Sequence, residues 1–132
     1  MNLGKYKHVL VADDSFTVRQ VLKRYLTSRG DVVVCGEAVN GREAVQRAMA
    51  LKPDLVLLDL AMPEMNGAEV ASVLKGAIPA TRIILFTMYR DNVGKYLTSA
   101  VGIDFVLSKP DGVAKLAAAI DSALDQISDS VQ

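Results

Sequence analysis

Four short apolar segments of this 132-residue chain are each followed by residues of the kinds that bind metal ions or phosphate. Asp13 and Asp14 follow residues 8–12, Asp59 follows 55–58, Thr87 follows 82–86, and Ser108 and Lys109 follow 103–107. Two carboxylates about 4 Å apart repel by roughly 4 kcal/mol at an effective dielectric near 20, so carboxylates that gather need a cation. Hard oxygen ligands at an open edge favour Mg²⁺, which keeps waters and accepts phosphate oxygens. We therefore predict a magnesium site where these segments end.

A divalent ion and a lysine that face a carboxylate are suited to phosphoryl transfer. That chemistry depends on position and charge neutralisation, and carboxylates do act as nucleophiles toward phosphoryl groups. Asp59 is the candidate nucleophile, because a carboxylate directly after the apolar run LVLL is costly to bury without a partner. Asp13 and Asp14 alone could simply begin a helix, and Thr87 or Lys109 alone would be unremarkable at a surface. The prediction depends on their joint occurrence.

Short apolar runs alternate with helical periods along the chain. The runs predict buried strands at residues 8–12, 32–36, 55–58, 82–86 and 103–107. Apolar residues at helical spacing lie at Val18–Tyr25, Ala44–Met49, Val70–Ala77, Val93–Ala100 and Val113–Ile120. Near-continuous apolar strands with helical crossovers indicate a parallel sheet covered on both faces. We predict an α/β fold with a five-stranded parallel sheet, doubly wound and flavodoxin-like, in which βα is repeated five times.

This architecture explains why residues far apart in sequence could share a site. In an open parallel sheet, ligands bind outside the carboxyl ends of the strands, and each candidate residue follows such an end. The candidate N-caps of the helices are Ser15, Asn40 and either Asp91 or Asn92, with Asn66 a further helix-start signal. The sequence lacks the glycine patterns of dinucleotide-binding and P-loop proteins. The predicted site therefore consists of side chains rather than a glycine cradle.

The composition favours one globular domain, at residues 1–127, with a polar C-terminal tail at 128–132. Hydrophobic residues make up 51% of the chain, and 15 Lys and Arg balance 15 Asp and Glu. A balanced chain lacks the basic surface expected of a nucleic-acid or membrane-surface binder. The longest apolar runs are far too short to span a bilayer, and the N-terminus does not resemble a secretory signal. One cysteine, Cys35, cannot form an internal disulfide, so we expect a cytoplasmic protein.

Several motifs carry a resemblance to a known family. They are LVADDS at 10–15, EAVNGREAV at 37–45, PDLVLLDLAMPEMNG at 53–67, FTM at 86–88 and SKP at 108–110. In this order they resemble the bacterial response regulator receiver domain, over about residues 8–125. The details are most similar to receivers of the NarL/LuxR type, which usually precede a helix-turn-helix DNA-binding domain. No such output domain is present in this sequence, so we expect a single-domain regulator or a piece of a longer one.

The resemblance implies a phosphorylation site and a set of metal ligands. Asp59 would accept the phosphoryl group. Asp14 would bind Mg²⁺ directly, with help from Asp13 through water, and the backbone carbonyl of Ala61 would be a further ligand. The donor would be the phosphohistidine of a histidine kinase, a phosphotransfer protein or a small phosphodonor. The domain would then be a regulatory switch in a two-component system or phosphorelay, not an enzyme.

The resemblance also implies residues that contact the phosphoryl group. Thr87 would hydrogen-bond to it and Lys109 would pair with it. The peptide bond before Pro110 would be cis, which X-Pro bonds adopt at modest cost. Phosphorylation would change the surface of the domain, and the output would be docking to a partner or formation of a homodimer.

Three departures from the family pattern concern the switch region and the lifetime of the phosphoryl group. Val106 stands where the family usually has an aromatic residue, and alternation along the strand predicts that Phe105 points to the opposite face. Met88 stands where a small residue is frequent. Ala61 and Tyr89 stand at positions that tune hydrolysis in the family, and neither side chain orients water. We therefore expect slow dephosphorylation.

Three alternative functions remain open at this stage. A phosphatase of the haloacid dehalogenase type would need a second Asp two residues after Asp59, where Ala61 stands. A pseudo-receiver would bind partners without phosphorylation, which Val106 allows but the intact acidic set disfavours. A flavodoxin-like flavin binder would need a polar phosphate loop where Asp13 and Asp14 stand, and those carboxylates would repel phosphate.

Overall fold

The computed structural model describes residues 6–87, 103–108 and 112–131 of the chain. Five parallel strands form one sheet in the order β2-β1-β3-β4-β5. The strands are β1 (Lys7–Ala12), β2 (Val32–Ala38), β3 (Leu55–Leu58), β4 (Arg82–Thr87) and β5 (Phe105–Ser108). The helices are α1 (Phe16–Arg29), α2 (Gly41–Leu51), α3 (Gly67–Ala77) and α5 (Gly112–Val131). The predicted α/β fold with a parallel sheet is confirmed, and the helix predicted at Val93–Ala100 lies outside the described residues.

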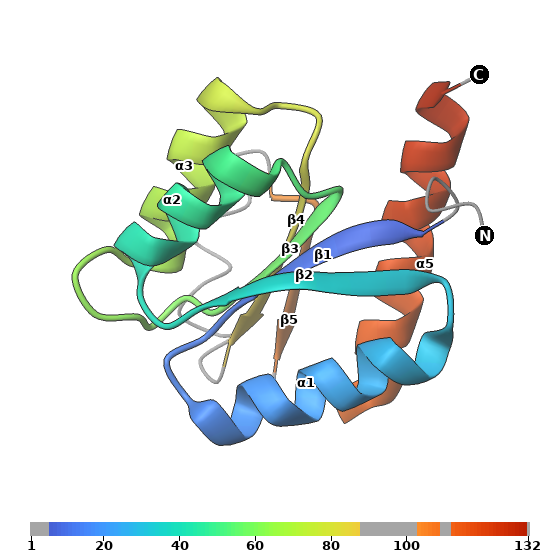
Figure 1. Cartoon of the computed structure of the whole chain (residues 1–132), viewed down its shortest axis with the longest axis horizontal. Coiled ribbons are helices and arrows are strands. Elements are labelled where there is room, and N and C mark those ends of the chain that lie inside the picture. The colour runs from blue at the N-terminus through green and yellow to red at the C-terminus, as the bar shows by residue number, and fades with distance from the viewer. Residues whose placement is uncertain (1–5, 88–102, 109–111, 132) are drawn as a thin grey trace.

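The helices cover both faces of the sheet (Figure 1). Val9, Val11 and Leu57 pack toward α1 and α5, whereas Leu10 and Leu58 pack toward α2 and α3. Successive strand residues point to opposite faces, so a run such as LVLL is buried on both sides. Each such side chain stabilises the fold by about 1.5–3 kcal/mol relative to full exposure. The middle of the sheet is therefore a rigid base for residues at the strand ends.

Local capping signals determine where the helices begin. The Ser15 side chain accepts a hydrogen bond from the Val18 amide at the start of α1. Asn40 caps α2, and Asn66 caps α3 in a reciprocal capping box with Glu69. These interactions satisfy amide groups that a helix N-terminus otherwise leaves without acceptors. The helix starts predicted at Ser15, Asn40 and Asn66 are thus confirmed.

Two details of the helices differ from the sequence prediction. Val21 belongs to the apolar stripe predicted within Val18–Tyr25, but it is 51% exposed, whereas Leu26, just beyond that range, is buried. The buried positions Leu22 and Leu26 are four residues apart, one turn along the same face, whereas Val21 is rotated toward solvent. At the C-terminus, α5 continues to Val131, so residues 128–131 extend this helix rather than form a separate tail.

No described helix is both long and apolar enough to cross a bilayer.

Candidate metal site

Asp13 and Asp59 are neighbours because their strands are neighbours in the sheet. Ala12 of β1 pairs with Leu58 of β3, and the Asp59 amide donates to the Ala12 carbonyl at 2.9 Å. Oxygens of Asp13, Asp14 and Asp59, one from each carboxylate, all lie within 4.8 Å of one another. The sequence predicted that these acidic groups would meet at one edge, and this placement is confirmed.

The three carboxylates differ in their access to solvent. Asp13 is 2% exposed and Asp59 is 5% exposed, whereas Asp14 lies at the surface. Buried carboxylates at this spacing are strongly unfavourable unless cations or hydrogen-bond donors compensate for them. Oxygen ligands with one open side match the preference of Mg²⁺, which retains several waters. The residues present therefore fit a magnesium ion that is bound from the solvent side.

Main-chain amides of the β1–α1 loop, which carries Asp13 and Asp14, donate hydrogen bonds that hold this loop in place. The Asp13 amide donates to the Ala38 carbonyl at 3.0 Å, and the Ser15 amide donates to the Asp13 carboxylate at 2.9 Å. A side chain from α1 also reaches this loop, since Arg19 donates to the Asp13 carbonyl at 2.9 Å. Nothing in the sequence around Arg19 indicates that its side chain turns back to this loop, so its contact with Asp13 could not be predicted.

The β3–α3 loop shapes the other wall of the site. The Gly67 amide donates to the Leu60 carbonyl at 2.9 Å, which folds the loop back onto Asp59. A Cβ atom at Gly67 would lie 2.5 Å from the Asp59 carbonyl oxygen, so only glycine fits without movement. Glu64 adopts a left-handed backbone conformation with φ of 71°. Ala61 is exposed in this loop, two residues beyond Asp59.

The remaining predicted site residues are described only in part. Thr87 is the last residue of β4 and pairs with Ser108 of β5, so the two strand ends lie side by side. Outside the described residues lie the side chains of Thr87 and Val106 and the whole of Met88, Tyr89, Lys109 and Pro110. Phe105 is half-buried against the core on the α1 and α5 side. Its orientation relative to Val106 stays a prediction, because the side chain of Val106 lies outside the described residues.

Comparison with known families shows which family this chain belongs to. The model of the response regulator receiver domain matches residues 9–121, which is most of the chain. The chain belongs to the response regulator receiver family. Receiver domains are phospho-accepting regulatory domains of two-component systems that typically bind Mg²⁺ at an acidic pocket, and the cluster of Asp13, Asp14 and Asp59 is compatible with such a pocket.

Relatives of this receiver domain include longer response regulators. Response regulator protein VraR of Staphylococcus aureus is 33% identical over 112 residues, which is 85% of this chain and 54% of VraR. The chain thus spans about half the length of the curated relatives it matches. The response regulator domain of Thermotoga maritima CheB is 31% identical, with a TM-score of 0.74 over 94% of this chain and 95% of that one. The receiver domain of Geobacillus stearothermophilus AraT has a TM-score of 0.85 over 96% and 98%, at 23% identity, and supports the fold alone.

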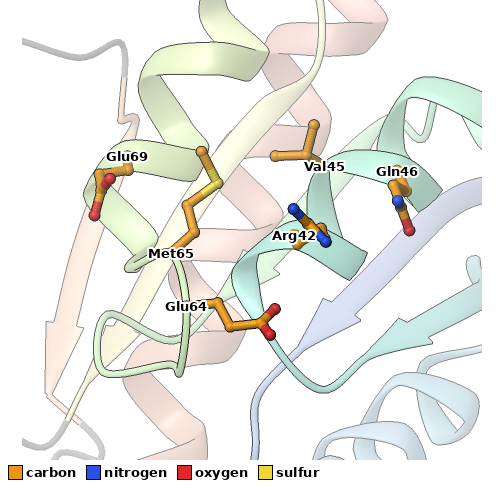
Figure 2. Close-up of a pocket in the computed structure, with 6 residues that line it drawn as sticks. All are labelled: Arg42, Val45, Gln46, Glu64, Met65 and Glu69. Atoms are coloured by element: carbon orange, nitrogen blue, oxygen red, sulfur yellow. The ribbon is translucent and has the colours of Figure 1, made fainter.

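A separate hollow lies beside α2 in this receiver domain (Figure 2). It has a volume of about 530 Å³ and is lined by Arg42, Val45, Gln46, Glu64, Met65 and Glu69. The residues come from α2, from the β3–α3 loop and from the start of α3. Charges of both signs, from Arg42, Glu64 and Glu69, occur in its lining.

Proposed function

We propose that this receiver domain is a phosphorylation-dependent signalling switch in which Asp59 accepts the phosphoryl group. One observation carries the proposal: Asp59 is almost fully buried, yet its carboxylate lies beside those of Asp13 and Asp14. Such a cluster is favourable when a divalent cation is bound, and Mg²⁺ bound there would still accept phosphate oxygens. Asp59 follows a rigid buried strand, which gives a nucleophile a defined position.

In the proposed reaction, a carboxylate oxygen of Asp59 forms a bond to phosphorus as the bond from phosphorus to the donor breaks. The product is an acyl phosphate on Asp59. The donor leaves as the unphosphorylated histidine side chain of its protein or, for a small phosphodonor, as the small acid. Asp13, Asp14, Asp59 and the Ala61 carbonyl would hold Mg²⁺, which supplies positive charge to the phosphoryl oxygens. The carboxylates of this chain thus serve as metal ligands and, for Asp59, as the nucleophile as well.

Residues at the ends of β4 and β5 would contact the phosphoryl group. Thr87 would donate a hydrogen bond to it, and Lys109, before a cis peptide bond at Pro110, would form an ion pair with it. A switch from 1:99 to 99:1 needs about 5.5 kcal/mol of differential stabilisation. Hydrogen bonds to a charged group contribute about 1.5–3 kcal/mol each, so a few of them are sufficient. The response would change the surface around Met88, Tyr89, Phe105 and Val106.

The phosphoryl donor would be a histidine kinase, a phosphotransfer protein or a small phosphodonor, in the cytoplasm. The changed surface would bind a partner protein or a second phosphorylated copy, and this domain itself would not contact nucleic acid. A helix between β4 and β5 would complete the fourth βα repeat, so that all five strands are followed by a helix. Apart from its own phosphorylation and slow dephosphorylation, the domain would catalyse no reaction.

The central test is to incubate the protein with Mg²⁺ and acetyl phosphate and to weigh the intact chain. The wild type should gain the mass of one phosphoryl group, and the Asp59→Asn variant, which keeps the shape of the side chain, should gain none. Asp54→Asn is a matched control, because Asp54 lies at the opposite end of β3 and should leave the adduct unchanged. Equal adducts on the wild type and Asp59→Asn, or no adduct on the wild type, would overturn the proposal.

A further inference from the structure

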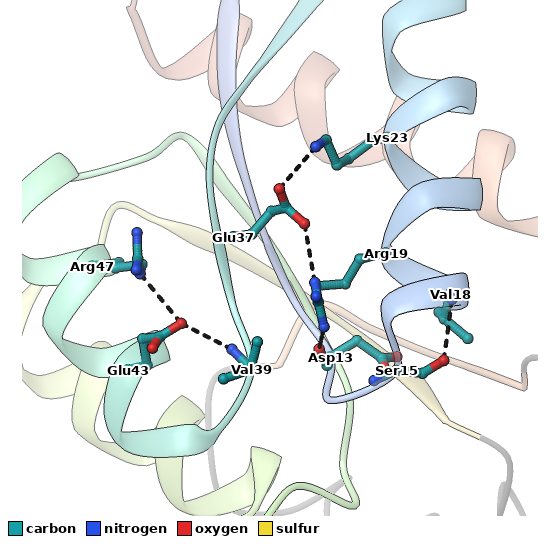
Figure 3. Close-up of polar contacts among 9 residues, drawn as sticks. All are labelled: Asp13, Ser15, Val18, Arg19, Lys23, Glu37, Val39, Glu43 and Arg47. Carbon is teal, nitrogen blue, oxygen red and sulfur yellow. Dashed lines mark hydrogen bonds and ion pairs between the residues drawn. The ribbon is translucent and has the colours of Figure 1, made fainter.

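The main chain of Asp13 is held in place by a side chain of the neighbouring helix. The Arg19 guanidinium donates through Nη1 to the Asp13 carbonyl at 2.9 Å and through Nε to Glu37 at 3.0 Å (Figure 3). The Arg19 side chain is only 11% exposed. One planar group therefore bridges the acidic loop and the end of β2. Because the fork of a guanidinium is rigid, these two bonds together fix its orientation.

Glu37 is the anchor of this bridge. Its second carboxylate oxygen accepts a hydrogen bond from Lys23 Nζ at 2.8 Å, so the carboxylate lies between two cations of α1 (Figure 3). The hydrogen bond from Lys23, aided by that from Arg19, lowers the pKa of the Glu37 carboxyl despite its partial burial. Glu37 is thus held as a carboxylate, which keeps Arg19 pointing at the Asp13 carbonyl.

An irregularity in β2 turns the Glu37 side chain toward α1, where it contacts Arg19. Val9 pairs with Val34 but Leu10 pairs with Gly36, so Cys35 is an extra residue in the edge strand. Such a bulge reverses the alternation of all later side chains. Val32 and Val34 face α1 and α5, and with strict alternation Glu37 would face the opposite side. The bulge turns Glu37 toward α1 and places Ala38 in the core beside α2.

We infer that Arg19, oriented by Glu37, is a positioning residue for metal binding at the acidic cluster. The inference rests on the proposed function, since the ion in question is the Mg²⁺ of that site. Arg19 touches the Asp13 carbonyl, not the ion. Its bond holds the β1–α1 loop so that the carboxylates of Asp13 and Asp14 stay together before the metal arrives. Groups that orient the ligands of a metal typically contribute 10- to 100-fold to its affinity.

A positioning role for Arg19 and a purely electrostatic role predict opposite effects of its removal on the affinity for Mg²⁺. If Arg19 acted only as a nearby positive charge, its removal would reduce repulsion and strengthen the binding of Mg²⁺. If Arg19 positions the loop, its removal weakens the binding. The test is isothermal titration of the whole chain with Mg²⁺. Arg19→Gln should lower the affinity about 10- to 100-fold. Arg19→Lys should fall between Arg19→Gln and the wild type, because a single ammonium cannot reproduce the two bonds of the fork.

Lys23→Gln is the matched control. Like Arg19→Gln, it removes one positive charge from α1 and one cation that contacts Glu37. Unlike Arg19→Gln, it leaves the hydrogen bond from Arg19 to the Asp13 carbonyl in place. Its affinity for Mg²⁺ should equal or slightly exceed that of the wild type. The backbone amide resonances of residues 13–15 should shift without metal in Arg19→Gln and remain in place in Lys23→Gln. If Arg19→Gln does not fold, judged by thermal unfolding without Mg²⁺, the same comparison is made with Arg19→Lys.

The results separate this inference from the proposed function. If the wild type binds Mg²⁺ and forms the adduct, but the Arg19 variants bind the ion as tightly as the wild type or more tightly, only the inference is wrong. If Lys23→Gln loses as much affinity as Arg19→Gln, a general loss of stability replaces the positioning role. If the wild type binds no Mg²⁺, the proposed function is wrong, and the inference is wrong with it.

Discussion

Gly67 is the residue at which a single methyl group should disturb the candidate site most directly. It is the first residue of α3, and an added Cβ would lie 2.5 Å from the Asp59 carbonyl oxygen and 2.9 Å from Leu60 Cα. Both atoms belong to the main chain, so rotation of a side chain cannot relieve the overlap. Since favourable contacts lie near 3.5–4.0 Å, the helix and the backbone at Asp59 must separate by about 1 Å.

This displacement sets the expected magnitudes for Gly67→Ala. Overpacking of this kind typically costs about 1–3 kcal/mol, which corresponds to a fall in Tm of about 3–15 °C for a domain of this size. A misplacement of about 1 Å at a reacting group costs about 100-fold in rate. Gly67→Ala should therefore slow the phosphorylation of Asp59 by about 100-fold while the domain still folds with a lower Tm.

Gly76→Ala is the control within the same helix. A Cβ there would meet no atom within 4 Å, so alanine should raise stability by about 0.4–1 kcal/mol and leave the rate unchanged. The assays are thermal unfolding by circular dichroism and the rate of adduct formation with acetyl phosphate and Mg²⁺. If Gly67→Ala matches Gly76→Ala in both measurements, the close approach of α3 to Asp59 does not constrain the site.

Three further predictions concern single side chains. Ala61→Asn or Tyr89→Glu should speed the loss of the phosphoryl group from Asp59, because each supplies a group that can orient water; an unchanged decay rate by intact mass for both variants would refute this. Glu37 has a pKa below its ordinary value of 4.5, so its carboxylate stabilises the fold above that pH, and this stabilisation is lost as the pH falls through the lowered pKa. The difference in Tm between the wild type and Glu37→Gln should therefore shrink from neutral pH toward about pH 3, and a constant difference would contradict the ion-pair argument. Burial raises the pKa of the half-buried Cys35 thiol, so iodoacetamide at neutral pH should react several-fold more slowly with the folded chain than with urea-unfolded chain; equal rates would show that this thiol is accessible.

The strands and helix starts could be predicted because their signals are local. LVLL at 55–58 is apolar at every position, and the strand forms with those bounds. Asn66 followed by Glu69 forms a capping box through groups only three residues apart. Interactions within one turn or one short run depend little on the rest of the fold. Predictions of this kind were therefore accurate to within one or two residues.

The burial of individual helix residues was less predictable. Val21 has the same apolar character as Leu22, yet Val21 faces solvent and Leu22 enters the core. Which side of α1 is buried depends on how the helix is rotated against the sheet. A stripe of apolar residues that is wider than the contact leaves this rotation undetermined in the sequence.

Along the chain, residue types and their spacing specified a parallel α/β sheet and the strand ends at which Asp13 and Asp59 stand. A sheet of parallel strands brings those ends to one edge, so the acidic cluster followed from order and spacing alone. The bridge from Glu37 through Arg19 to Asp13 could not be read in that way. It exists because one extra residue, Cys35, in the edge strand turns Glu37 to the other face. A bulge arises from the pairing between strands, and that pairing forms only when the chain is folded.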